Sequence, residues 1–286
     1  MIFDCHAHIL SGDIECYPVA PLGGELRPGE LDDPVTAERL IGFMDEHDVR
    51  QAVLVQRAYV YGFNNDYVLD SAERHPERLR ALCMVDARSA ATPGTVRRLL
   101  TERGAIGIRL TEPYKGSDTS WFCSAEALRT WNAVAELGAS MRLHLFRWNR
   151  ADCLPDVEKM ARRFRETNIV VDHLSNLAAE EGPPEYGVDE ALRRLMELDN
   201  VYLMFSTINL GKLAAEGKPA APVLAHLVAE FGSDRIMWGS DIGQSRQSYA
   251  EMCALADAAT ATLSFDERND VMCRTGRHVY GWHGDG

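Results

Sequence analysis

Eight short apolar segments of strand type alternate with eight longer segments of helical period along this chain of 286 residues. Such an alternation is typical of repeated βα units, whose strands pair in parallel, and it predicts an α/β protein. The predicted strands are residues 2–8, 51–56, 79–85, 105–111, 141–146, 169–175, 201–206 and 235–241. The predicted helices are residues 36–47, 65–74, 95–103, 124–137, 155–166, 188–198, 222–231 and 248–262.

The number of repeats distinguishes the two common parallel architectures. A doubly wound open sheet usually has about five or six parallel strands, whereas eight βα units at this length match a closed (β/α)8 TIM barrel. The first strand is not followed by a G-x-G-x-x-G phosphate loop, which argues against an open-sheet oxidoreductase. No linker, internal repeat or low-complexity run marks a second domain. A single barrel domain over residues 1–286 is therefore predicted.

The charge and the apolar pattern limit the expected partners. The chain has 43 acidic and 30 basic residues and a formal net charge of −13, so neither nucleic acid nor an anionic membrane surface is an expected partner. No segment approaches the roughly 18 consecutive apolar residues of a membrane span, and the N-terminus lacks the basic start of a signal peptide. The seven cysteines are dispersed and form no C-x-x-C pair. We expect a cytoplasmic protein, and the sequence leaves a homo-oligomer open.

The sharpest local signal is the segment Asp4-Cys5-His6-Ala7-His8 on the first predicted strand. Residues two apart point to the same side of a strand, so His6 and His8 are expected to face the barrel interior and Cys5 the surrounding helices. Two imidazoles side by side suit one divalent cation, with nitrogen atoms about 2.1 Å from the ion. The alternative is that buried histidines only bond backbone carbonyls. Asp4 is expected to be a structural carboxylate.

Three further polar residues lie at the carboxyl ends of other predicted strands. His144 is on the fifth strand, His173 is on the sixth, and Asp241 ends the eighth. The carboxyl ends of barrel strands converge on one site, so these residues are expected to meet His6 and His8 there. Such a cluster predicts a metal site, although His173 alone could also be a core histidine.

This pattern resembles the amidohydrolase superfamily of metal-dependent hydrolases. Within it the chain is most similar to the amidohydrolase-related branch of dicarboxylate and sugar-acid lactonases and of aminocarboxymuconate-semialdehyde and resorcylate decarboxylases. The resemblance covers almost the whole chain. It is carried by the histidines and the aspartate above and by the motifs G-I-R-L at 107–110, V-Q at 55–56 followed by N-N at 64–65, and V-Y-G-W at 279–282.

The departures from the family pattern bear on the metal. Binuclear members carry a bridging carboxylated Lys or a Glu on the fourth strand, where this chain has Arg109, so the resemblance implies one metal ion or none. Some lactonases of the branch lack the fifth-strand histidine and work without metal, and His144 therefore favours one bound ion. His and carboxylate ligands accept both zinc and manganese, so both ions are candidates. Zinc is expected before manganese. Residues 242–244 also differ from the aromatic residue and proline of many relatives.

These residues suggest a division of roles. A cation held by His6, His8 and His144, with Asp241 as a further ligand, would lower the pKa of a bound water and polarise a substrate carbonyl. Asp241 is the expected general base, and His173 is expected to orient the water or stabilise the oxyanion.

Arginines near the same strand ends predict an anionic small-molecule substrate. Arg57, Arg109 and Arg147 could each grip a carboxylate, and Tyr59 is a further candidate for substrate binding. The alternatives are that Arg109 pairs with a buried carboxylate such as Asp4 or Asp172, and that Arg57 and Arg147 are solvated rim residues. Substrate choice is expected to depend on loops such as residues 11–34 and 211–222.

The predicted function is a metal-dependent hydrolase that opens a small carboxylate-bearing lactone or a related ester-like ring. The motif at 107–110 and the second strand favour the lactonase side of the branch. A non-oxidative decarboxylase of an aromatic or unsaturated acid could use nearly the same ligands and is the first alternative. A barrel that has lost catalysis and only binds a partner is the second, and the complete set of site residues argues against it.

Overall fold

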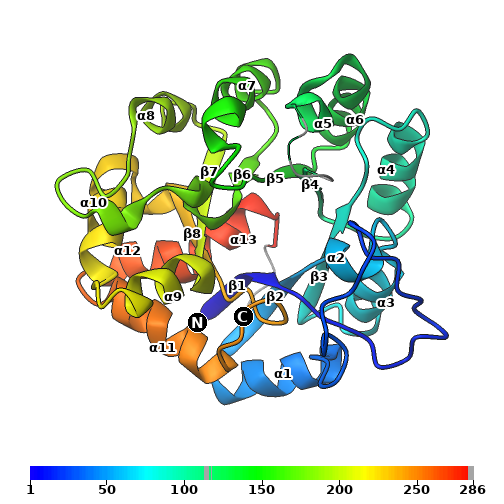
Figure 1. The fold of residues 1–286 in the computed structure, drawn as a ribbon, viewed down its shortest axis with the longest axis horizontal. Helices are drawn as coiled ribbons and strands as arrows, with labels where there is room; N and C mark the ends of the chain where they lie inside the picture. Colours follow the sequence, from blue (N-terminus) through cyan, green and yellow to red (C-terminus); the bar gives the residue numbers. More distant parts are fainter. Residues whose placement is uncertain (113–115, 117, 283–286) are drawn as a thin grey trace.

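The computed structural model describes residues 1–112, 116 and 118–282, and its centre is a sheet of eight parallel strands (Figure 1). Each strand pairs with its neighbours in the chain, in the order β1 to β8. All eight predicted strands are present, and they form the nearly closed barrel expected from the sequence. Their bounds are β1 (Ile2–Ala7), β2 (Val49–Val55), β3 (Leu79–Met84), β4 (Gly107–Thr111), β5 (Ser140–His144), β6 (Ile169–Val171), β7 (Val201–Ser206) and β8 (Ile236–Gly239).

The barrel closes between β8 and β1. The backbone N–H of Asp241 donates to the carbonyl of His6 at 2.8 Å, and the N–H of His8 donates to the carbonyl of Ile242 at 2.9 Å. A parallel bridge pairs Ala7 with Ile242. These bonds lie at the carboxyl ends of the two strands, so the seam of the barrel carries three predicted site residues.

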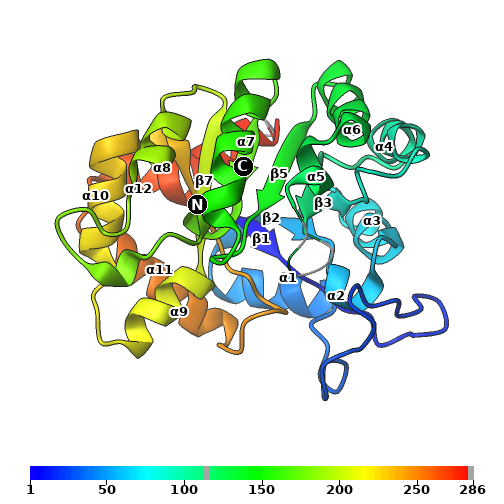
Figure 2. The ribbon, with the colours of Figure 1, turned by 45° about the horizontal axis from the view of Figure 1, so that its top comes forward.

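Helices surround the barrel, and shorter ones lie in its connecting loops (Figures 1 and 2). The eight predicted helices are present with shifted bounds. No helix of the described ranges is both long and apolar enough to span a membrane. The helices are α1 (Ala37–Glu46), α2 (Ala58–Tyr61), α3 (Asp66–Arg74), α4 (Thr92–Thr101), α5 (Ser120–Cys123), α6 (Ala125–Glu136), α7 (Arg150–Arg163), α8 (Glu190–Met196), α9 (Thr207–Ala215), α10 (Ala221–Phe231), α11 (Tyr249–Thr260), α12 (Phe265–Asn269) and α13 (Thr275–Val279).

Helix α9 was not among the predicted helices. Its start is fixed by a capping box, in which the Ser206 hydroxyl accepts from the backbone of the first turn and the Asn209 side chain accepts from the N–H of Ser206. Ser206, Thr207 and Asn209 at this helix start are short polar residues. They interrupt the apolar period by which the other helices were predicted.

The apolar core has two layers, one on each side of the barrel wall. The outer layer lies between the strands and the helices and includes Leu54, Leu143 and Trp238. The inner layer fills the barrel below the site and reaches the C-terminal segment that follows α13. Its members are Phe3, Cys5, Val53, Val55, Leu82, Val170, Tyr202, Met204, Met237, Cys273, Val279, Tyr280 and Trp282.

Strand β1 contains a bulge that corrects the predicted direction of Cys5. Asp4 pairs with Ala52 and Ala7 pairs with Leu54, so three steps on β1 face two steps on β2. The extra residue breaks the alternation of side chains. Cys5 therefore belongs to the inner layer instead of packing against the helices, and the inward direction of the next histidine is retained.

Strand β6 is shorter than predicted. It ends at Val171, whereas the prediction extended it to residue 175. Residues 173–176 adopt positive φ angles between 51° and 57°, which no strand contains. The run of apolar and β-branched residues does not reveal this turn, because side chains from other elements hold it in place.

The close contact between α13 and β1 generates a stability prediction. A Cβ atom on Gly276 would lie 2.3 Å from the Cys5 sulfur and 2.8 Å from the Phe3 ring. We expect Gly276→Ala to lower the free energy of unfolding by about 1–3 kcal/mol, because the inner layer has no room for a methyl group. The matched control is Gly94→Ala in α4, where nothing lies within 4 Å, and it should stabilise the protein by up to about 1 kcal/mol. Urea unfolding measures both, and equal midpoints would contradict the prediction.

Candidate active site

A narrow cavity lies at the carboxyl ends of the strands, where the predicted site residues converge. Its volume of about 40 Å³ holds a few water molecules at most. Of the predicted site residues, His6 and Arg147 are the two outside its lining. The lining residues are His8, Arg57, Ala58, Tyr59, Arg109, Thr111, His144, His173, Ile208, Asp241 and Gln244.

His6 near the end of β1 and His8 directly after it face each other inside the barrel, as predicted. Their Nε2 atoms lie 3.0 Å apart. The Nδ1 of His8 lies 2.7 Å from the carbonyl of Val55 and donates to it, because a carbonyl can only accept. The Nε2 of His8 therefore presents a lone pair to the site. Burial lowers the pKa of His6 and His8 well below the usual range, so both rings are neutral at neutral pH.

Asp241 completes this cluster from the end of β8. Its Oδ1 lies 3.5 Å from Nε2 of His6 and 3.6 Å from Nε2 of His8. This oxygen is buried and has no hydrogen-bond partner among the described residues, whereas Oδ2 accepts from the Ser245 hydroxyl at 2.8 Å. Burial raises the pKa of the Asp241 carboxyl to about 7. The backbone φ of Asp241 is +63°, a strained value of the kind often found at functional sites.

Three atoms of this cluster fit a divalent cation. Ligands of a tetrahedral zinc ion lie about 3.3 Å from one another, and the three measured separations are 3.0, 3.5 and 3.6 Å. A cation would also satisfy Oδ1 of Asp241, a buried acceptor without a partner. Binding would displace one proton, because Arg142 donates to Nδ1 of His6 at 2.7 Å and a neutral His6 therefore carries its proton on Nε2. The separations of these three atoms therefore fit a cation once Nε2 of His6 has lost its proton.

His144 and His173 complete the ring of histidines. The centroid of the His173 ring lies 5.2 Å from those of His6 and His144. His144 lines the cavity, and its Nδ1 lies 3.3 Å from the Thr111 hydroxyl. Within the described ranges, two groups of three ligand atoms lie within 4.8 Å of one another: His6, His8 and Asp241, and His6, Asp172 and His173. His144 is in neither group, so its place among the metal ligands stays a prediction.

An ionic network lies beneath the cavity; its pair of Arg109 with Asp172 is one of the alternatives expected from the sequence, whereas the part of Arg142 was not predicted. The Asp172 carboxylate accepts from Nε of Arg109 at 2.8 Å and from Nε of Arg142. Arg142 also donates to the Cys5 carbonyl at 2.7 Å and to the Tyr280 hydroxyl at 2.9 Å. Burial would raise the pKa of Asp172, but the two guanidinium charges outweigh it and hold the pKa well below its usual range. Spacing in the sequence could have revealed Arg142, because it lies two residues before His144 on β5 and therefore points to the same side of the strand.

The predicted substrate-binding residues have different surroundings. Arg109 lines the cavity, where it could contact a substrate, and it also pairs with the buried carboxylate of Asp172. Both alternatives considered for Arg109 are therefore compatible with the structure. Arg57 is buried, with an exposed fraction of 2%, and its Nη2 lies 2.6 Å from the Glu30 carboxylate. The alternative of a solvated rim residue is therefore wrong for Arg57. Arg147 is exposed outside the cavity and pairs with Glu180.

Asp4 has the structural role expected of it. Its Oδ1 accepts from the N–H of His6 at 3.0 Å and from the N–H of Ser240 at 2.9 Å. Its Oδ2 accepts from the hydroxyl of Tyr249 in α11 at 3.0 Å. The Asp4 carboxylate thus connects the bulge of β1 to the end of β8, next to the cluster of His6, His8 and Asp241.

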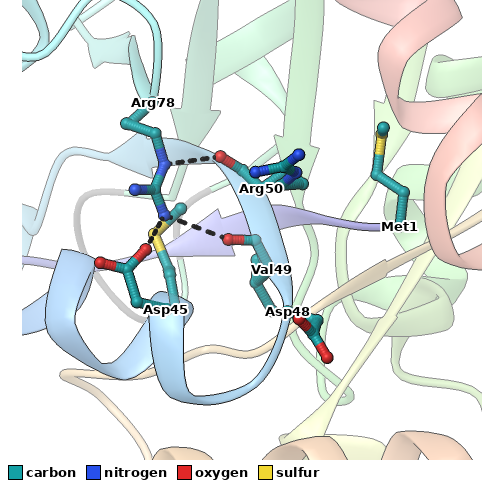
Figure 3. Close-up of a pocket in the computed structure, with 7 residues that line it drawn as sticks. Met1, Asp45, Asp48, Val49, Arg50 and Arg78 are labelled. Atoms are coloured by element: carbon teal, nitrogen blue, oxygen red, sulfur yellow. Dashed lines mark hydrogen bonds and ion pairs between the residues drawn. The ribbon is translucent and has the colours of Figure 1, made fainter. Parts of the chain in front are cut away.

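A larger hollow of about 550 Å³ lies at the opposite end of the barrel, where β2 and β3 begin (Figure 3). Arg78 is bonded within the protein, at 2.7 Å to Asp45 and at 2.8 and 3.3 Å to the carbonyls of Arg50 and Val49. Its lining contains no histidine. The chemistry is therefore expected at the carboxyl ends of the strands.

A (β/α)8 barrel with a histidine pair on β1, histidines at the ends of β5 and β6 and an aspartate after β8 defines the class of the amidohydrolase-type enzymes. The profile of the amidohydrolase family matches residues 3–282, and the chain belongs to this family.

Similar proteins share this class. The chain is 29% identical over 246 residues to 4-sulfomuconolactone hydrolase of Rhizobium radiobacter, covering 84% of this chain and 74% of that protein. A probable 2-pyrone-4,6-dicarboxylic acid hydrolase of Acinetobacter baumannii with bound citric acid superimposes with a TM-score of 0.72, at 18% identity over 98% of this chain and 99% of that one.

Two similar structures contain metal ions. An amidohydrolase of Burkholderia multivorans with bound zinc has a TM-score of 0.71, at 21% identity over 98% of this chain and 99% of that one. The 5-carboxyvanillate decarboxylase of Novosphingobium aromaticivorans, in complex with manganese, also has a TM-score of 0.71, at 13% identity over 98% of this chain and 96% of that one. At these identities the likeness establishes a common fold.

The network beneath the cavity generates a second stability prediction. We expect Asp172→Asn to lower the free energy of unfolding by about 3–5 kcal/mol, because a neutral amide leaves two buried guanidinium groups without a counter-charge. The matched control is Asp33→Asn, which breaks the exposed pair with Arg39 and should cost less than about 1 kcal/mol. Urea unfolding of both variants tests this, and a similar small loss in the two would show that the buried pairs contribute little.

Proposed function

We propose that this protein is a hydrolase that opens a small carboxylate-bearing lactone, or a related ester-like ring, with a divalent cation at the mouth of the barrel. The observation that carries the proposal is the buried Oδ1 of Asp241, which lacks a partner and lies 3.5 and 3.6 Å from two imidazole nitrogens. The similarity to 4-sulfomuconolactone hydrolase over most of the chain supports a lactone as the substrate class. Zinc is the first candidate for the cation and manganese the second.

His6, His8 and Asp241 would hold the cation, with His144 as a further ligand. When bound, the cation would polarise the substrate carbonyl and lower the pKa of the attacking water. Asp241 accepts the proton of that water and returns it to the ring oxygen that leaves when the ester bond breaks. Burial raises the pKa of the metal-free carboxyl to about 7, and a bound cation would lower it towards the ionised form that accepts a proton. His173 lines the same cavity and supplies a hydrogen bond to the oxyanion.

The arginines of the cavity would bind the carboxylate of the substrate. Arg109 and Arg57 both line the cavity, and Tyr59 lies beside them. Arg57 is already paired with Glu30, which comes from the long segment between β1 and α1. A substrate carboxylate would replace Glu30 at this guanidinium.

The first test joins metal content to activity. We expect the purified protein to bind about one zinc or manganese ion per chain and to open 4-sulfomuconolactone, 2-pyrone-4,6-dicarboxylate or a related lactone with release of one acid equivalent. Asp241→Asn should lower kcat by at least about 100-fold, because it removes the general base. His6→Ala combined with His8→Ala should abolish metal binding, as measured by elemental analysis.

The matched control for these variants is Asp45→Asn at the opposite end of the barrel, which should leave kcat unchanged (Figure 3). Full activity of Asp241→Asn would exclude the proposed base. Release of carbon dioxide from an aromatic or unsaturated acid, with no hydrolysis of any lactone, would replace the proposal by a decarboxylase.

The second test addresses the charge of the substrate. Citrate serves as an anionic probe, and its binding is measured by calorimetry. Arg57→Met should weaken binding by about 10-fold or more, because it removes a charge-assisted hydrogen bond. Glu30→Gln should strengthen binding by a similar factor, because the competing carboxylate is gone. Unchanged affinity in both variants would show that Arg57 does not take part in anion binding.

A further inference from the structure

A left-handed turn directly after β6 holds one of the cavity histidines. His173, Leu174, Ser175 and Asn176 have φ angles of 51°, 52°, 57° and 51°. None of them is glycine, and each left-handed residue costs roughly 1–2 kcal/mol of backbone energy. Four in succession persist only where the surrounding structure determines them, so the contacts of this turn indicate what it positions.

Hydrogen bonds with three other segments hold the turn. The amide of Asn176 donates to the Leu145 carbonyl after β5 at 2.6 Å, and Arg150 of α7 donates to the Ser175 hydroxyl at 2.9 Å. Asn209 of α9 donates to the carbonyl of His173 at 2.9 Å. The first residue of the turn is therefore fixed by the capping box of α9.

The same capping box also contacts the His173 ring. The Ser206 hydroxyl lies 2.7 Å from Nδ1 of His173 and accepts from the N–H of Ile208 at 3.2 Å. Ser206 is fully buried, and Nδ1 is the one acceptor that the described residues offer to its proton. If Nδ1 donated instead, the hydroxyl proton would be buried without a partner, at a cost of about 1–3 kcal/mol. The satisfied arrangement has Ser206 donating to Nδ1.

We propose that Ser206 and Asn209 are positioning residues that hold His173 as a neutral imidazole with its proton on Nε2, so that the ring donates into the cavity. A neutral ring that accepts at Nδ1 must carry its proton at Nε2. Nε2 has no hydrogen-bond partner among the described residues, and His173 lines the cavity.

Of the two roles expected for His173, orienting the water and stabilising the oxyanion, this ring state favours the second. A protonated Nε2 can donate a hydrogen bond to a carbonyl oxygen or an oxyanion. The role of His173 as a hydrogen-bond donor would then be set by the helix cap at Ser206, which ends β7. The chemical consequence rests on the proposed function, whereas the state of the ring does not.

The decisive measurement is nitrogen NMR of the metal-free protein with 15N-labelled histidine rings. His173→Asn assigns the signals of His173. We expect the wild-type signals to show a ring protonated at Nε2 and not at Nδ1. Ser206→Ala should abolish that pattern, giving the other tautomer or a mixture, and Ser206→Thr should retain it because the hydroxyl is kept.

The matched control is Ser264→Ala, which removes the same kind of capping box from α12 and should leave the His173 signals unchanged. This control separates loss of a helix cap, which costs about 1 kcal/mol in either variant, from loss of the bond to the ring. A wild-type ring protonated at Nδ1, or a Ser206→Ala variant with an unchanged tautomer, would overturn the inference.

Kinetics on whichever lactone the enzyme opens supply the functional arm. Ser206→Ala should lower kcat about 10-fold with little change in KM, and it should have no further effect in the His173→Asn background. An equal loss in both backgrounds would refute a role that acts through His173. If the NMR result is as expected and no lactone is opened, the proposed function fails while the assignment of the ring stands.

Discussion

The site depends on one buried carboxylate. Asp172 lies between the guanidinium groups of Arg109 and Arg142, and it joins the ends of β4, β5 and β6 inside the barrel. Two buried positive charges are tolerated there because the pairing is close and because Arg142 also satisfies the Cys5 carbonyl and Nδ1 of His6. Arg142 of β5 thus fixes the orientation of the His6 ring on β1, and this orientation determines where Nε2 of His6 lies in the ligand cluster.

The opposite wall of the site depends on close packing between β1 and β8. A Cβ atom on Gly239 would lie 2.4 Å from Cβ of His6, so only glycine allows the two strands to approach at that point. Asp4 then bonds the backbone of both strands and the Tyr249 hydroxyl. This packing places Asp241 beside the two histidines, and it leaves Oδ1 of Asp241 buried and without a partner among the described residues. The unsatisfied oxygen and the raised pKa have the same physical cause.

Much of the fold and part of the site were predictable from the sequence. The eight strands follow from short apolar runs, and the barrel follows from their number. His8, His144, His173 and Asp241 meet because every strand of a parallel barrel ends at the same face. Arg142 was overlooked because its importance depends on a partner 30 residues away. The inward direction of Cys5 and the pairing of Arg57 with Glu30 were not predictable, since a bulge and a loop contact leave no periodic trace.

The sequence by itself therefore determined the architecture, the family and most of the polar groups at the mouth of the barrel, because these depend on local periodicity and on the order of strands. The tertiary structure decided which of those groups are already paired, which ring nitrogen carries a proton and which carboxylate oxygen has no partner. These properties depend on contacts between segments that are distant in the chain. The turn at His173 illustrates the difference, because the capping box of α9 holds it and no property of its own residues requires it.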